Sequence, residues 1–145
     1  MMIDIPVLLI DATGNVADNP ICSPCIQCFL SADVTSSPNG PFLAMLDSGA
    51  APSAIDNSVA TALNLPIVGS DTVHSALTVN LVPKYAAVMA ISGFPPIQIE
   101  LMGIDHRRTG HPYDLILGRA FLTMFDFGFD RESGVWRLRR ASLHA

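Results

Sequence analysis

Short apolar segments are the feature of this 145-residue sequence that most restricts its fold. Clusters of Pro, Gly, Asn and Asp separate one segment from the next, and "SSPNGP" and "DRESG" are turns of this kind. Short apolar segments with such turns between them are typical of an all-β domain. The predicted strands are Ile5–Ile10, Ile26–Ala32, Phe42–Leu46, Val73–Leu77, Tyr85–Ile91, Ile97–Leu101, Asp114–Leu117, Phe125–Asp130 and Val135–Leu138.

Two short helices interrupt these strands. In "DNSVATALNLP", Asp56 is a suitable N-cap, Asn64 can adopt the left-handed conformation that ends a helix, and Pro66 prevents continuation. The second helix is "RAFLTMF", which starts just after Gly118.

Composition narrows the class of protein. Half of the residues are hydrophobic and only 14% are charged, which indicates a large buried interface. With a net charge of −5 and eight basic residues, the chain lacks the broad positive surface that nucleic acid requires, so no nucleic-acid partner is expected. No segment reaches the roughly 18 apolar residues of a membrane span, and no basic segment precedes "IPVLLI" as in a signal peptide. We therefore expect a cytoplasmic protein without a membrane span.

The cysteines Cys22, Cys25 and Cys28 have the spacing C-x2-C-x2-C, which is similar to that of metal or iron–sulfur ligands. A fourth ligand would have to come from a distant histidine or from another chain. The segment also continues into a predicted strand, where Cys22 and Cys28 would face one side and Cys25 the other. We interpret the three as ordinary reduced thiols and expect no metal or cofactor, with a cysteine-ligated metal protein as an alternative.

The stretch "FLAMLDSGA" places one carboxylate, Asp47, at the end of an apolar strand. Gly49 permits unusual backbone angles and the close approach of another chain. Ser48 offers a hydroxyl that can donate or accept a hydrogen bond across an interface, and Ala50 keeps the space small. Taken alone, these residues also fit an ordinary turn acid at a strand end.

The downstream stretch "YDLILGRAFLTMFDFGFD" contains an apolar strand that ends abruptly at Gly118. A helix begins at the next residue, Arg119. If this strand lies beside the strand that ends on Asp-Ser-Gly, the two following loops can cross closely.

With both stretches in view, the sequence resembles the retropepsin-like (retroviral-type) aspartic proteases, and most of all their cellular and bacterial single-domain members. "LDSGA" is similar to their active-site motif, apolar-Asp-Thr/Ser-Gly-Ala, and "LILGRAFL" is similar to their second signature. The resemblance implies an all-β, retropepsin-like closed barrel or sandwich with two short helices. It covers residues 26–138 as the protease domain, preceded by a strand and loop segment at 1–25 and followed by a C-terminal tail at 139–145.

The resemblance also implies roles for individual residues. Asp47 would be the catalytic carboxylate, and Ser48 would replace the usual threonine, whose hydroxyl binds the two active-site loops together. The implied site consists of Asp47 as catalytic residue; Ser48, Gly49 and Ala50 as active-site loop and dimer contact; Ile116, Leu117, Gly118 and Arg119 as second signature loop; and Ala76, Leu77, Thr78 and Val79 as flap and substrate-binding residues.

Two features depart from the family pattern. In the retroviral enzymes the arginine matching Arg119 pairs with an acid just after the motif, but Ala51 stands at that position here, and Asp56 is a candidate substitute. The flap is predicted as the hairpin Val73–Ile91 with its tip at Leu77–Lys84. Retroviral flaps have glycine-rich tips, whereas this tip has no glycine and contains a proline.

The sequence contains a single Asp-Ser-Gly, at Asp47. Aspartic proteolysis needs two carboxylates around one water, one ionised and one protonated, and the pair shares a proton. One copy per chain therefore predicts a symmetric homodimer with its two-fold axis between the aspartates. The expected function is an aspartic endopeptidase whose partners are a second copy of itself and a peptide or protein substrate. The alternative is a catalytically inactive retropepsin-fold dimerisation or peptide-binding module.

Overall fold

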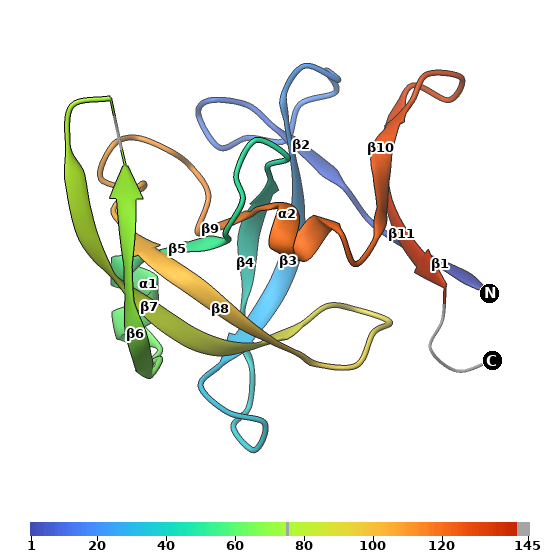
Figure 1. Cartoon of the computed structure of the whole chain (residues 1–145). Helices are drawn as coiled ribbons and strands as arrows, with labels where there is room; N and C mark the ends of the chain where they lie inside the picture. Colours follow the sequence, from blue (N-terminus) through green and yellow to red (C-terminus); the bar gives the residue numbers. More distant parts are fainter. Residues whose placement is uncertain (75, 142–145) are drawn as a thin grey trace.

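The computed structural model describes residues 1–74 and 76–141, and about half of these residues lie in strands of two sheets, whereas the two helices are short (Figure 1). The all-β prediction is therefore confirmed. The strands are β1 (Met2–Ile5), β2 (Leu8–Ile10), β3 (Ser23–Ser31), β4 (Asn39–Leu46), β5 (Ala54–Asp56), β6 (Ile67–His74), β7 (Val79–Ala90), β8 (Ile97–Ile104), β9 (Leu115–Leu117), β10 (Asp126–Asp130) and β11 (Val135–Ala141), and the helices are α1 (Asn57–Ala62) and α2 (Arg119–Leu122).

The larger sheet closes into a barrel. Its strand order is β2-β3-β4-β9-β5-β8-β7-β6, and β3 also pairs with β7, so the strands from β3 round to β7 form a ring. The strands β2 and β6 lie outside this ring. Side chains of β3 alternate along the strand, with Ile26, Cys28 and Leu30 buried in the core and Gln27 exposed. The predicted closed barrel is confirmed.

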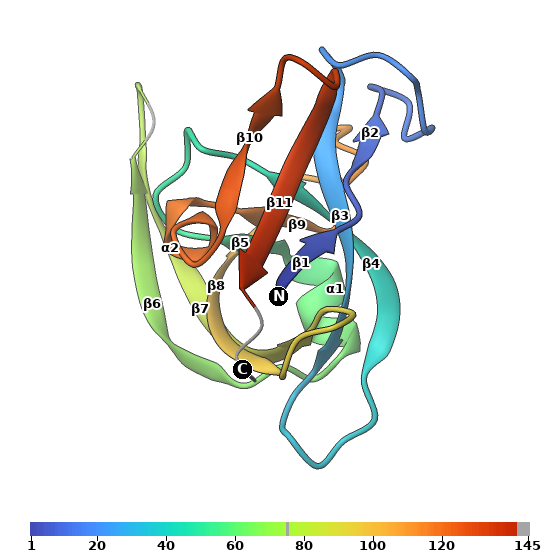
Figure 2. The same cartoon turned by 90° about the vertical axis from the view of Figure 1, so that its right-hand side faces the viewer.

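The smaller sheet joins the two ends of the chain in the order β1-β11-β10. Strand β1 runs antiparallel to β11, with Met2 opposite Ala141 (Figure 2). The predicted single strand Ile5–Ile10 is therefore wrong, because β1 belongs to this sheet and β2 to the barrel. Pro6 stands between them and has no N–H to continue a strand ladder. Residues 142–145 of the expected tail lie outside the described residues, and the division at 25 and 138 stays a prediction.

Helix α1 begins and ends as its sequence predicts. Asp56 is the N-cap and accepts a hydrogen bond from the Ser58 N–H at 3.1 Å, and Asn64 has a φ of 53°. No helix among residues 1–74 and 76–141 has the length and hydrophobicity needed to span a membrane.

The predicted strand Val73–Leu77 is wrong, because β6 runs from Ile67 to His74 and residue 75 lies outside the described residues. Strand β6 stands outside the ring and is exposed along almost its whole length. It therefore lacks the alternation of apolar and polar residues that marks a half-buried strand. The short strand β5 was not predicted. Its residues are all buried and run directly into α1, so no turn residue separates the two.

The cysteines lie in or beside β3. Cys22 precedes the strand and is half-buried, whereas Cys25 and Cys28 are fully buried inside it. Burial raises the pKa of both buried thiols to about 12, so they are protonated and unreactive.

Candidate active site

Asp47 lies where two parallel strands end together. Strand β4 pairs in parallel with β9, and Leu46 lies opposite Leu117 at the last position of both strands. The Asp47 N–H donates to the Leu117 carbonyl at 2.9 Å. Because parallel strands end at the same edge of a sheet, the loops that follow them meet there. The structure thus brings together the two sequence stretches that carry the resemblance.

The two loops cross at Gly118. The Arg119 N–H donates to the Ala50 carbonyl at 2.8 Å, and the Gly118 N–H donates to the Ser53 hydroxyl oxygen at 3.1 Å. A Cβ atom at Gly118 would lie 2.7 Å from the Ala50 carbonyl oxygen and closer still to that of Pro52. Only glycine allows this crossing, because any side chain would overlap the backbone of the active-site loop, residues 47–53.

The Asp47 carboxylate is held by its own loop. Its Oδ1 accepts a hydrogen bond from the Gly49 N–H at 2.9 Å, and Asp47 itself is half-buried. Ser48 and Gly49 are exposed on the single chain. The Ser48 side chain makes no hydrogen bond within the described part of the chain. The Ser48 hydroxyl is therefore a free polar group beside the carboxylate.

The Arg119 side chain supports the active-site loop by binding a backbone carbonyl of that loop. The Arg119 Nη1 donates to the Ser48 carbonyl at 2.7 Å. Asp56 is not its partner, so that candidate pairing is wrong. The Asp56 carboxylate instead accepts hydrogen bonds from the Ser58 N–H and hydroxyl and, at 3.1 Å, from the Arg107 N–H. Burial opposes its ionisation, but these hydrogen bonds outweigh burial and lower the pKa of Asp56.

The predicted flap is the hairpin of β6 and β7, but its tip lies earlier in the chain than expected. The last paired residues are His74 and Val79, so the described tip residues are 76–78, and the tip is not Leu77–Lys84. Ala76, Leu77 and Thr78 lie at this tip, and Val79 begins β7. Leu77 is 94% exposed, and Leu81 further along β7 is also exposed, which leaves an apolar surface at the end of the hairpin.

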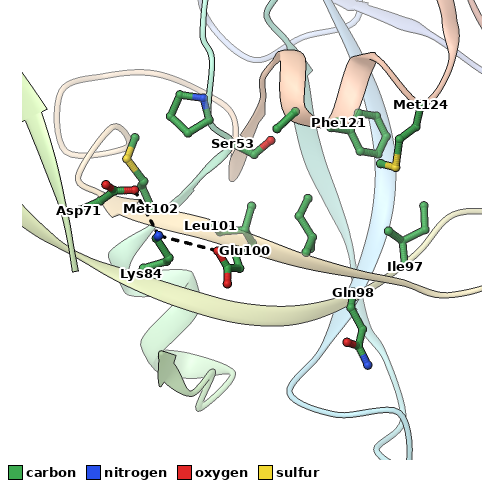
Figure 3. A pocket seen from close by; sticks show the side chains of 13 residues that line it. Ser53, Asp71, Lys84, Ile97, Gln98, Glu100, Leu101, Met102, Phe121 and Met124 are labelled. Carbon is green, nitrogen blue, oxygen red and sulfur yellow. Dashed lines mark ion pairs between the residues drawn. The ribbon is translucent and has the colours of Figure 1, made fainter. Parts of the chain in front are cut away.

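Lys84, expected near the tip, lies instead in the middle of β7 and lines a groove of about 380 Å³ (Figure 3). Its Nζ is 3.6 Å from Asp71 Oδ2 on β6 and 3.8 Å from Glu100 Oε2 on β8. Pro52 and Ser53, from the active-site loop, line the same groove. Lys84 therefore links three neighbouring strands at the base of the hairpin.

A second cavity, of about 510 Å³, opens directly beside Asp47. One side is formed by β4, β8 and β9, and the other by residues 105–114, which we call the wall loop. The lining residues are Met45, Asp47, Ile104, Asp105, His106, Thr109, His111, Tyr113 and Ile116. A carboxylate thus stands at the edge of a cavity that is large enough for a side chain of a bound peptide.

Asp114 ties the wall loop to the strand that leads to Asp47. One Asp114 oxygen lies 2.9 Å from Arg107 Nη1, and the other accepts the Leu43 N–H at 2.9 Å. From the sequence, Asp114 is placed only at the start of a predicted strand, with no functional role. No local signal could have found its role, since Leu43 is 71 residues away in the chain.

Other reactive groups do not assemble into a site. Within residues 1–74 and 76–141, no three His, Cys, Asp or Glu side chains are grouped so that they could hold a metal ion. The cysteine spacing therefore has no matching ligand cluster in the described part of the chain.

Comparison with known proteins adds to this geometry. No family model matches the sequence, and no curated protein matches it. The structure is similar to the crystal structure of a retropepsin-like aspartic protease from Rickettsia conorii, with a TM-score of 0.57 over 98% of this chain and 94% of that chain. The fold is retropepsin-like. The two sequences are 17% identical, so the similarity concerns the fold, and this retropepsin-like barrel places Asp47 at the crossing of its two loops.

Proposed function

We propose that this chain is an aspartic endopeptidase that acts as a symmetric homodimer, with a water molecule activated between two Asp47 carboxylates. One observation carries the proposal. In a retropepsin-like barrel, Asp47 stands where β4 and β9 end side by side and their loops cross at Gly118. A carboxylate fixed at this edge, next to a cavity of about 510 Å³, suits the hydrolysis of a bound peptide.

The proposed chemistry needs a second carboxylate, which the second chain supplies. Two carboxylates about 3 Å apart cannot both ionise, so the pair holds one proton. The ionised Asp47 takes a proton from water, and the oxygen of that water bonds to the scissile carbonyl carbon. The protonated Asp47 donates to the carbonyl oxygen, which becomes a hydroxyl. The C–N bond then breaks as the Asp47 that took the proton from water gives it to the leaving nitrogen, and the other Asp47 takes back a proton from a hydroxyl of the intermediate, which restores the starting pair.

Exposed polar groups on the single chain support the approach of a second copy. Ser48 and Gly49 are exposed beside the half-buried Asp47. In the proposed dimer each Ser48 hydroxyl would hydrogen-bond to the active-site loop of the partner. Arg119, which donates to the Ser48 carbonyl, would hold this loop in the shape that the partner meets.

The hairpin of β6 and β7 is the proposed cover of the substrate. Its tip exposes Leu77, and Val79 and Leu81 follow on β7 with most of their surface in solvent. Apolar side chains at the end of a two-stranded hairpin can fold over an extended peptide and exclude water from it. We propose Ala76, Leu77, Thr78 and Val79 as the residues that contact substrate.

A peptide library tests this function. Incubation between about pH 4 and pH 7, followed by mass spectrometry, should show new internal cleavage products that pepstatin suppresses. The Asp47→Asn variant keeps the shape of the side chain but cannot act as the base, so it should yield none of them. Peptides that bind without being cleaved would instead favour the dimerisation or peptide-binding module. Cleavage that only chelators inhibit would point to metal chemistry.

A further inference from the structure

His106 is a buried histidine whose ring nitrogens have no hydrogen-bond partner in the described part of the chain. It follows β8 at the start of the wall loop and is only 5% exposed. Neither of its ring nitrogens has a hydrogen-bond partner, and they are the only buried side-chain nitrogen or oxygen atoms in this state among the described residues. Buried polar groups are normally paired, so an unpaired imidazole requires an explanation.

The backbone of His106 organises the wall loop. Its carbonyl oxygen accepts three hydrogen bonds, from the Thr109 N–H at 3.2 Å, the Thr109 hydroxyl at 2.8 Å and the His111 N–H at 3.1 Å. The same loop lines the cavity beside Asp47. The position of the His106 ring and the shape of this cavity wall are therefore linked.

The ring is placed where a positive charge is disfavoured. Burial lowers the pKa of His106, and it outweighs the backbone groups of Tyr113 and Asp114 and the Asp56 carboxylate, which favour protonation. His111, from the same loop, opposes protonation when it is charged. At neutral pH the buried ring is thus uncharged.

The charged residues on either side of His106 are engaged elsewhere. Asp105 Oδ1 accepts a hydrogen bond from Asn57 Nδ2 at 2.9 Å. Arg107 Nη1 lies 2.9 Å from Asp114 Oδ1. The Asp105 and Asp114 carboxylates are therefore already paired with other groups, and Arg107, itself a cation, cannot act as a counter-ion when the ring takes up a proton.

We propose that His106 is a positioning residue: its uncharged ring, packed under the wall loop, holds that loop against the Asp47 cavity, and protonation of the ring releases the loop. The release itself is independent of catalysis. Its effect on cleavage rests on the proposed function, because displacement of the wall would then deform the cavity that receives substrate.

The direction of the pH effect follows from proton linkage. A ring that is harder to protonate in the closed loop than in the open loop binds more protons when the loop is open. Closure is therefore fully favourable above the ordinary pKa of histidine, about 6.5. Below that value the equilibrium constant for loop closure falls by up to about tenfold per pH unit, until the pH reaches the lowered pKa that His106 has in the closed loop. Mild acid would open the wall.

Hydrogen exchange measured by mass spectrometry tests the release on the full chain. After correction for the intrinsic chemical rate, exchange at residues 105–114 should rise by up to about tenfold per pH unit as the pH falls below about 6.5, while β3 and β4 stay protected. His106→Gln removes the titrating ring and should abolish this dependence. His74→Gln, at the exposed end of β6 and outside the wall loop, should keep it. Equal pH dependence in His106→Gln and the parent would overturn the proposal.

Two further measurements separate the possible failures. If His106→Gln does not fold, ¹³C-labelled imidazole NMR of the parent decides. The His106 ring should titrate below the ordinary histidine pKa of about 6.5, and loop exchange should stop rising once the pH falls below the midpoint of that ring. Exchange that keeps rising well below this midpoint would overturn the proposal. If the parent cleaves peptides, His106→Gln should extend kcat/KM to lower pH. A parent that cleaves nothing would contradict the proposed function while leaving the exchange result to decide the role of His106.

Discussion

At the scale of single residues, the site depends on close approach more than on unusual backbone angles. Gly118 has an ordinary φ of −87°, yet carbonyl oxygens of the active-site loop fill the space where its Cβ would be. The requirement for glycine is therefore steric. Ser53 completes the crossing from the other side, because its buried hydroxyl oxygen accepts the Gly118 N–H.

Gly118→Ala tests this crossing. The added methyl group would meet backbone that cannot move aside, and overpacking of this kind costs about 1–3 kcal/mol of unfolding free energy. Urea denaturation should show this loss. Gly128→Ala is the matched control, because a Cβ there meets nothing within 4 Å. Equal stability of the two variants would mean that the loops do not cross as described.

At the scale of elements, features that depend on nearby residues were predicted correctly from the sequence, and features that depend on long-range strand pairing were not. The caps of α1, Asp56 and Asn64, depend on neighbours a few residues away and could be predicted from the sequence. The start of β6 could not, because a strand outside the barrel ring lacks a buried face. Lys84 was placed at the flap tip, since nothing in the local sequence shows that Asp71 and Glu100 flank it on adjacent strands.

The candidate site shows the same division. Asp47 and Gly118 were found because short motifs surround them, and the structure brings both to one place. The partner of Arg119 was predicted wrongly, and His106 and Asp114 were not recognised. Their environments are built by segments far away in the chain, so that no single stretch of sequence carries the signal.

Asp114→Asn tests the attachment of the wall loop to β4. The amide retains one acceptor but loses the charge that pairs with Arg107, so we expect a loss of about 1.5–3 kcal/mol in unfolding free energy, the range for hydrogen bonds to charged groups. Thermal and urea unfolding at neutral pH would measure it. The control is Asp126→Asn, on the exposed edge of β10. A loss confined to the control, or no loss in either variant, would contradict this role.

At the scale of the whole molecule, the single chain offers one carboxylate at the loop crossing and exposes the residues next to it. Ser48 and Gly49 are exposed to solvent in the single chain. Half of the residues in the sequence are hydrophobic. The smaller sheet brings the first and last strands, β1 and β11, together on one side of the barrel (Figure 2). The proposed dimer would cover the exposed loop and complete the site.

Ser48→Ala tests the dimer. If each Ser48 hydroxyl bonds to the partner loop, its removal leaves buried groups unpaired at a cost of roughly 1–3 kcal/mol each, and both copies change at once. Sedimentation should show weaker dimerisation, and specific activity should fall most at low protein concentration. Ser48→Thr retains a hydroxyl and should behave like the parent, and Ser37→Ala, in an exposed loop, should change nothing. Parent-like dimerisation of Ser48→Ala would exclude this contact.

The central claim is that two copies of Asp47 form one catalytic site, and a mixing experiment tests it most directly. Parent and Asp47→Asn chains are combined at constant total concentration, allowed to exchange subunits, and assayed for peptide cleavage. If both carboxylates are required, activity follows the square of the parent fraction, so an equal mixture retains about a quarter of the parent activity. A linear decline, with about half of the activity left, would show that one chain suffices and would contradict the account.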